Sequence, residues 1–323
     1  MAFGQIFGGL IPGWDIFGLS WRPIFLIAVP LCAISWYVTG LLIDDDAVAV
    51  KRPNLDALSF LLLACGYGLT LLPVANVNET PFFFQGAGVF ALGIVFLAAF
   101  VYRQGVLTQL GKQPMMPTFL FRNKTYVVGV LLNFLLYAAG IPFFFVLGLY
   151  FLGSLKYPLA TAGLAFTPIA FGVMVGSRIS SELLSRFGIK TITGSITLMA
   201  IGIAGCLLIT RSVDMTNVMM ILIEIALLVF GLGNGIAMPI TTGIVLTELP
   251  PERAGIGASI LTAAQQLGGV AGIAVTGAVT LNAEPNLAPN FTNGFFVQMA
   301  FASFAIICTL VLVTRARRAK QSH

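Results

Sequence analysis

Residues 217–246 read NVMMILIEIALLVFGLGNGIAMPITTGIVL, and Glu224 is the one charged residue among them. An α-helix rises 1.5 Å per residue, so about 20 apolar residues cross the hydrocarbon core of a bilayer. The stretch does not alternate polar and apolar residues, as the strands of a membrane β-barrel do. It therefore predicts a membrane-spanning helix that carries a few polar groups.

The rest of the chain repeats this pattern. With residues 217–246, apolar runs of spanning length predict nine complete helices, and residues 2–12 add an apolar piece too short to cross alone. The expected fold class is an all-α membrane protein, with about nine complete transmembrane helices plus a partial one. The other eight runs cover residues 23–42, 55–74, 82–102, 125–151, 158–177, 191–210, 257–281 and 295–314.

The composition excludes several classes of protein. Of the 323 residues, 58% are hydrophobic and 9% are charged, against about 25% charged in soluble domains. The one histidine is the last residue, His323, so a Ser-His-Asp triad or a His-ligated metal site is not expected. We expect no enzyme, no cofactor and no metal, and the partner expected first is the lipid bilayer.

The basic residues predict the orientation of the chain, because Lys and Arg collect in cytoplasmic loops. All but three of the 17 Lys and Arg residues fall in one set of alternate loops and the C-terminal tail; the exceptions are Arg22, Lys156 and Arg211. This bias predicts a cytoplasmic C-terminus in a multi-pass plasma (inner) membrane protein. The net charge of +5 then reflects topology and does not imply nucleic acid.

The longest interior polar stretch, residues 103–124, divides the spans into a front block and a back block of six. Six spans in one bundle form the half-molecule unit of many carriers, which bind substrate near the middle of the membrane.

Two acidic residues lie within the predicted spans. Asp56 suits the first turn of a helix, where it meets the positive end of the dipole. Glu224 lies about 10 Å into its span. It is either a proton- or cation-binding carboxylate that faces the bundle interior, or a residue near the headgroups of a tilted helix.

Two segments combine polar residues with helix breakers. Residues 230–239 (FGLGNGIAMP) contain Asn234 and are not expected to form a regular helix; they would be a hinge or cavity wall, or a close-packing site. A similar break is expected at residues 140–142 (GIP). Asn133 and Tyr137, four residues apart, share a face near it and could line one pocket, although Tyr137 could equally pack against a helix.

Small residues recur in the run 257–281. Ala264, Gly268 and Gly272 have the four-residue spacing that lets membrane helices approach closely. Gln265 and Gln266 flank this seam, and we expect at least one of them to point toward a partner or a polar cavity.

Several motifs together resemble the major facilitator superfamily, in particular its fourteen-span drug:proton antiporter branch. GQIFGG at residues 4–9 is similar to the GPxxGG antiporter motif, and WRPIFLIAVP at 21–30 to WRWIFLINVP. ATAGLAFTP at 160–168, SRFGIK at 185–190 and LPPERAGIGAS with QQLGGVAG at 249–272 also resemble motifs of that branch. Gln5, Ala28 and Ser185 depart from its pattern.

The resemblance implies a helical bundle in three parts: residues 1–53, a remnant of an N-terminal bundle; 54–124, two linker spans and a cytoplasmic loop; and 125–323, a six-helix bundle with a tail. It implies that the chain is truncated at its N-terminus. Gly4, Gly8 and Gly9 would form a helix-packing hinge.

The function implied is proton-coupled export of small hydrophobic organic compounds by alternating access. The candidate substrate and proton pathway residues are Asn133, Tyr137, Glu224, Asn234, Gln265 and Gln266. The alternatives are a facilitator or symporter of the same fold for a nutrient or siderophore, and a non-transporting truncated remnant.

Overall fold

Each of the nine predicted spans contains an α-helix, and none of the described residues forms a strand. The structure, a computed structural model, describes Gly4, Gly8, Met115, Leu120 and Leu249 together with residues 10–11, 22–42, 56–75, 86–110, 123–211, 217–247, 254–281 and 290–321. The elements are α2 (Pro23–Leu42), α3 (Ala57–Ala75), α4 (Ala87–Gln109), α5 (Lys124–Leu149), the π-helix η4 (Tyr150–Ser154), α6 (Leu159–Leu164), α7 (Thr167–Phe187), α8 (Lys190–Thr210), α9 (Asn217–Thr247), α10 (Ala254–Thr280) and α11 (Phe291–Gln321).

The predicted span 158–177 contains a break and is not one continuous helix. Within it, α6 ends at Leu164 and α7 begins at Thr167. Pro168 has no N–H to donate to the carbonyl of Leu164, four residues earlier, so the helix ladder is broken at this point. Beyond the break α7 continues to Phe187 and ends at Gly188, which has a φ of 61°, a conformation that glycine adopts without strain.

The predicted breaks at residues 140–142 and 230–239 are wrong. Pro142 lies within the continuous α5 and Pro239 within the continuous α9. The glycines of α9 instead let neighbouring helices approach: a Cβ on Gly231 would lie 2.5 Å from the carbonyl oxygen of Ile169 in α7, and Gly233 faces the Ser195 carbonyl in α8. Close packing is therefore what the structure shows for this glycine-rich segment.

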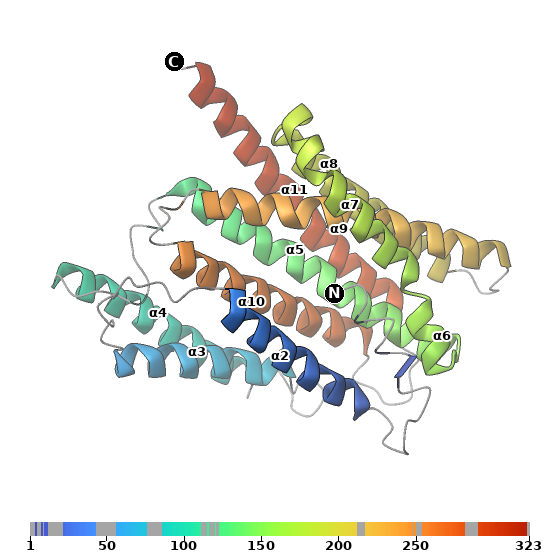
Figure 1. The fold of residues 1–323 in the computed structure, drawn as a ribbon, viewed down its shortest axis with the longest axis horizontal. Coiled ribbons are helices and arrows are strands. Elements are labelled where there is room, and N and C mark those ends of the chain that lie inside the picture. Colours follow the sequence, from blue (N-terminus) through green and yellow to red (C-terminus); the bar gives the residue numbers. More distant parts are fainter. Residues whose placement is uncertain are drawn as a thin grey trace.

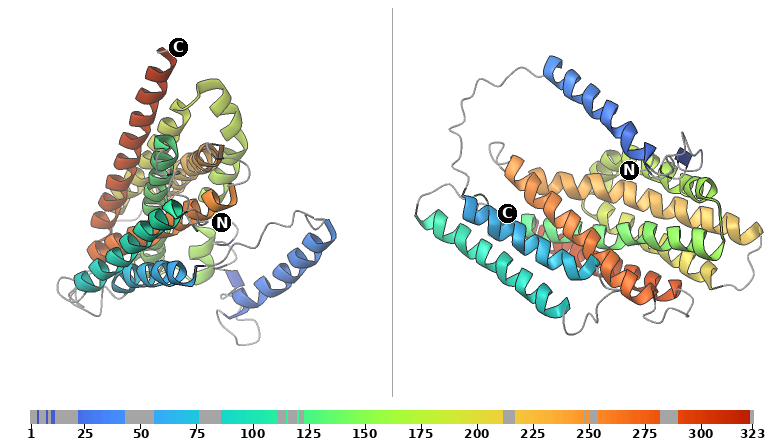
Figure 2. Two further views of the ribbon diagram at one scale, coloured as in Figure 1. Left: turned by 90° about the vertical axis from the view of Figure 1, so that its left-hand side faces the viewer. Right: turned by 90° about the horizontal axis from the view of Figure 1, so that it is seen from below.

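Helices α5 and α7–α11 form the main bundle (Figure 1). In it α9 packs between α7 and α8, while α5 packs against α10 and α11; α11 also contacts α8, and α5 contacts α9. The helices α3 and α4 pack together as a hairpin beside α10, and α2 stands apart from the bundle (Figure 2).

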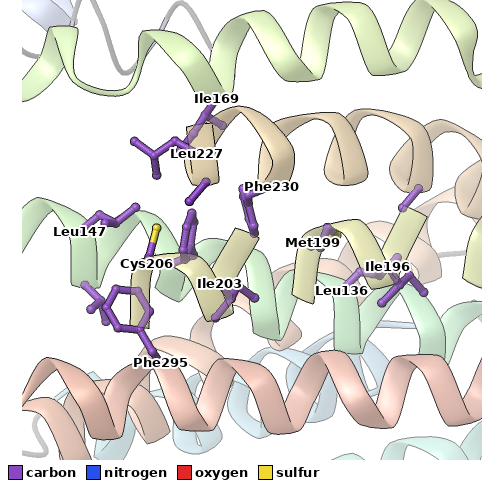
Figure 3. Close-up of a cluster of buried hydrophobic side chains, with 14 of the residues drawn as sticks. Leu136, Leu147, Ile169, Ile196, Met199, Ile203, Cys206, Leu227, Phe230 and Phe295 are labelled. Carbon is purple, nitrogen blue, oxygen red and sulfur yellow. The ribbon is translucent and has the colours of Figure 1, made fainter. Parts of the chain in front are cut away.

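The main hydrophobic core is made by the bundle helices. Phe143 of α5 stacks on Phe230 of α9, with ring centroids 4.0 Å apart, and meets Phe295 of α11 edge-on at 6.1 Å. Met199 and Cys206 of α8 are fully buried in the same core (Figure 3). A smaller cluster consists of Leu120, Tyr126, Val245, Leu249 and Leu261.

The outside of the bundle is apolar as well. Large side chains such as Phe171, Ile201, Leu208 and Phe304 are more than half exposed, which a water-facing surface would not sustain over so many residues. Among the described residues, eight helices are long and apolar enough to cross a membrane, and α3 carries a shorter apolar stretch, Ala57–Thr70. The protein is an integral multi-pass membrane protein.

Candidate functional site

A polar cluster joins three helices inside the bundle. Asn133 of α5 is fully buried, and its Oδ1 accepts hydrogen bonds from Gln265 Nε2 of α10 at 3.0 Å and from Thr242 Oγ1 of α9 at 3.5 Å. Its Nδ2 donates to the carbonyl oxygen of Gly129 at 3.0 Å. We call Asn133, Thr242 and Gln265 the Asn133 cluster.

The chain places this cluster between its two apolar clusters. Toward the start of α5, a Cβ on Gly129 would lie 2.5 Å from Cγ2 of Val245, and the Tyr126 hydroxyl donates to the Gly257 carbonyl at 3.2 Å. Toward the end of α5 lies the aromatic core around Phe143. Buried amides in hydrocarbon surroundings are costly unless paired, so the three side chains fix the spacing of α5, α9 and α10 at one level.

Two further candidates lie along the same helices. Asn234 of α9 is half-buried, and its Nδ2 would lie 3.5 Å from a Cβ on Gly140 of α5. Gly140 is seven residues beyond Asn133, about 10 Å along the helix axis. Tyr137, one turn beyond Asn133, is half-buried. The structure thus brings Asn133 and Gln265 into contact and places Asn234 and Tyr137 farther along α5.

Glu224 and Gln266 do not join the Asn133 cluster. Glu224 is exposed on α9 between the exposed Ile221 and Ile225, so its carboxylate does not face the interior of this bundle as the functional hypothesis expected. Gln266 is exposed on α10, whereas its neighbour Gln265 is partly buried. Successive residues on a helix point about 100° apart, so the two glutamines cannot share a face.

The glycines of the predicted packing motifs behave differently from one another. Any Cβ on Gly268 or Gly272 would collide with the carbonyl oxygens of Phe134 and Ala138, so both glycines lie where α10 touches α5. A Cβ on Gly4 or Gly8 would meet no atom of the described residues within 4 Å. Gly9 lies outside the described residues.

Asp56 caps α3 and also ties it to α4. Its carboxylate accepts from Arg103 Nε at 2.7 Å and Nη2 at 2.9 Å, and from Ser59 Oγ at 2.5 Å. The Arg103 guanidinium and then the Ser59 hydroxyl hold the pKa of Asp56 well below its usual range. Arg103, expected in a loop, lies within α4 because that helix continues to Gln109.

No group of three or more His, Cys, Asp and Glu residues that could hold a metal comes together in the part of the chain that the structure describes. The Asn133 cluster consists of neutral amide and hydroxyl groups, which can donate and accept hydrogen bonds without carrying charge. Its chemistry suits the orientation of a bound molecule.

Sequence reasoning identified Asn133 and Gln265 but missed Thr242. A spacing signal was present, because Asn234, Met238 and Thr242 follow one another at four-residue steps on one face of α9. Threonine is nonetheless a weak signal within a helix, since its hydroxyl usually bonds to its own backbone.

Comparison with known proteins identifies relatives among bacterial transporters. The chain is 26% identical over 277 residues to a probable actinorhodin transporter of Streptomyces coelicolor, covering 85% of this chain and 48% of the relative. It is 24% identical to the multidrug transporter protein MdtP of Bacillus subtilis, covering 88% and 52%. It is 25% identical to the lincomycin resistance protein LmrB of Listeria monocytogenes, covering 97% and 68%. The chain spans about half the length of the first two relatives.

A solved structure shares the fold. A bacterial homologue of the iron transporter ferroportin, crystallised in an inward-facing state, matches with a TM-score of 0.50 at 16% identity, covering 96% of this chain and 80% of that one. The family match is direct: residues 1–273 match the Major Facilitator Superfamily. With its apolar helices of spanning length, this match shows that the chain is a member of the major facilitator superfamily.

Proposed function

We propose that the chain exports small hydrophobic organic compounds in exchange for protons by alternating access, and that the Asn133 cluster lines the path. The observation that carries the proposal is the fully buried Asn133 amide, bonded to α9 and α10 at once. A binding site for a hydrophobic compound needs apolar walls and a few placed polar groups. The Asn133 cluster provides the polar groups, and the adjoining apolar side chains of α5 provide walls.

The names of the relatives support the choice of substrate class. They are described as transporters or resistance proteins for actinorhodin, lincomycin, tetracenomycin C and puromycin. All four are organic compounds, which supports an organic substrate for this chain as well. We also propose that protons drive the export. The C-terminus would lie in the cytoplasm, as the basic loops predict.

Alternating access requires helices that separate and rejoin, and the Asn133 cluster suits such a step. The Thr242 bond to Asn133, at 3.5 Å, is the longer of the two bonds between helices. When α9 moves away from α5, this bond breaks first, and the freed amide can bond to a substrate. We further propose that the chain is organised in the three parts expected from the sequence: residues 1–53, 54–124 and 125–323.

Transport in intact cells tests the proposal. The full chain is expressed in bacteria that lack their own main drug exporters, the cells are loaded with radiolabelled lincomycin or puromycin, and accumulation is followed before and after an uncoupler collapses the proton gradient. An exporter keeps accumulation low until the uncoupler is added, after which the label rises. A label that instead falls on uncoupling indicates import, and a label equal to that of empty-vector cells throughout contradicts transport.

The adjacent glutamines provide a matched pair of variants. Gln265→Leu removes the donor to Asn133 and is expected to lower export by about tenfold. Gln266→Leu makes the same chemical change on the exposed face and is expected to keep export near the wild-type rate. Equal loss in both variants would exclude a specific role for the Asn133 cluster.

A further inference from the structure

Three fully buried polar side chains of the packed helices α10 and α11 have no hydrogen-bond partner in the part of the chain that the structure describes. The hydroxyls of Thr276 and Thr280 and both amide atoms of Gln298 make no hydrogen bond to any described residue, and each side chain is 0% exposed. Buried polar groups in proteins are almost always paired. In hydrocarbon surroundings the cost of leaving them unpaired is greater still.

The two threonines also differ from several other threonines of the described helices. Thr70, Thr210, Thr241 and Thr262 each donate their hydroxyl to the carbonyl oxygen four residues earlier. Thr276 and Thr280 do not, although the same carbonyls are available within α10. Their hydroxyls are therefore free to bond to something other than their own helix.

The packing of α11 places these groups around one spot. Gly294 faces Thr280: a Cβ there would collide with Thr280 Oγ1, and it would lie 3.2 Å from Val146 Cγ2 and 3.4 Å from Thr276 Cγ2. Gln298 lies one turn farther along α11 on the same face as Gly294. Thr276 and Thr280 are likewise one turn apart on α10.

We propose that Thr276, Thr280 and Gln298 form a buried hydration site that holds one or more ordered water molecules between α10 and α11. Two hydroxyls and an amide offer both donors and acceptors, and a buried water typically needs about three such partners. The site carries no carboxylate, so its chemistry suits a neutral ligand better than a metal cation. Thr280 is the last residue of α10, so the site lies at the end of that helix.

Radiolytic labelling tests the proposal on the full chain in detergent. X-rays convert ordered water into hydroxyl radicals, which oxidise the nearest side chains, and mass spectrometry in ¹⁸O-water locates the products. Phe295 neighbours Gly294 on α11 and is 0% exposed. We expect Phe295 to be oxidised in the wild-type protein despite its burial, while the equally buried Phe230 stays unmodified.

Variants separate hydration from other causes of labelling. Thr276→Val and Gln298→Met remove the polar groups and are expected to abolish the label on Phe295. Thr309→Val is the control: it is also a buried threonine of α11, but its hydroxyl already donates to the Ile306 carbonyl at 2.7 Å, so the label is expected to remain. Should Gln298→Met fail to fold, Gly294→Ala places a methyl group against Thr280 and is expected to displace the water.

Three results would overturn the hydration site: Phe295 labelled no more than Phe230 in the wild type, a label that persists in Thr276→Val and Gln298→Met, or a label that vanishes when Na⁺ is replaced by choline. The last result would mean that a cation occupies the site. None of these results bears on the direction of transport. The hydration site and the proposed function are therefore tested independently of each other.

Discussion

At the scale of single residues, the buried Asn133 side chain of α5 bonds to Thr242 of α9 and to Gln265 of α10 at once. Asn133→Leu leaves the Gln265 amide without its acceptor, and we expect a loss of about 1–3 kcal/mol in the free energy of unfolding. Replacing both partners removes the unpaired group, so Asn133→Leu with Gln265→Leu should lose less than the sum of the two single losses. Thermal unfolding in detergent measures the cycle; strictly additive losses would mean that the 3.0 Å bond contributes no coupling.

At the scale of helices, the hairpin of α3 and α4 depends on the Asp56–Arg103 ion pair. The pKa of Asp56 is lowered in the folded protein, first by Arg103 and then by Ser59. A lowered carboxyl pKa adds stability above the unfolded value of about 3.9, and this stability is lost as the pH falls below it. Asp56→Asn should therefore lower the Tm by a few degrees at neutral pH, and the gap to wild type should narrow progressively as the pH falls below about 4 toward the lowered pKa of Asp56.

The matched control for this pair is Glu182→Gln. Glu182 pairs with Arg186 on the exposed end of α7, where both side chains are more than half exposed, and exposed pairs contribute about 0–1 kcal/mol. Its Tm should stay close to wild type at every pH. A gap between Asp56→Asn and wild type that does not change with pH would rule out the ionised pair as its cause.

The contact between α10 and α5 depends on glycine. Gly272→Ala puts a methyl group into the Ala138 carbonyl, so α10 must move away from α5, and we expect a loss of about 1–3 kcal/mol. Gly277→Ala lies five residues farther along α10, where a Cβ would be 3.8 Å from the Phe145 ring, an ordinary contact. That variant should be neutral or slightly more stable, because alanine favours helix over glycine. Equal Tm values for the two variants would contradict the packing role.

The elements themselves were largely predictable, because burial in lipid requires long apolar helices and those runs are visible in the sequence. The breaks were not. Pro142 and Pro239 lie within continuous helices, whereas Pro168 lies in the first turn of α7, just after the break that separates it from α6. Each of these prolines removes the backbone hydrogen bond to the carbonyl four residues earlier. Whether the helix then continues depends on the residues that pack around that carbonyl, which the sequence does not reveal.

The site was predictable only in part, for a similar reason. Asn133 and Gln265 stand out as amides in apolar runs, but their pairing with each other depends on which face of α5 meets α10. Glu224 stands out most in the sequence, yet it is exposed. Thr242, Thr276 and Gln298 were missed because neutral polar residues are common enough in membrane helices that one residue alone gives no signal.

At the scale of the whole molecule, the basic loops predict which end of the bundle faces the cytoplasm, and one span allows a direct test. Ser154 and Ser185 are both exposed serines, at opposite ends of the apolar segment Leu159–Phe187. The basic residues around Ser185 (Arg178, Arg186 and Lys190) predict that its end is cytoplasmic. After the four native cysteines are replaced by alanine, Ser154→Cys should react in intact cells with a maleimide that cannot cross the membrane, whereas Ser185→Cys should react only after the cells are opened. The reverse pattern would invert the topology and place the C-terminus outside. Labelling of both residues in intact cells would show that this segment does not separate the two aqueous phases.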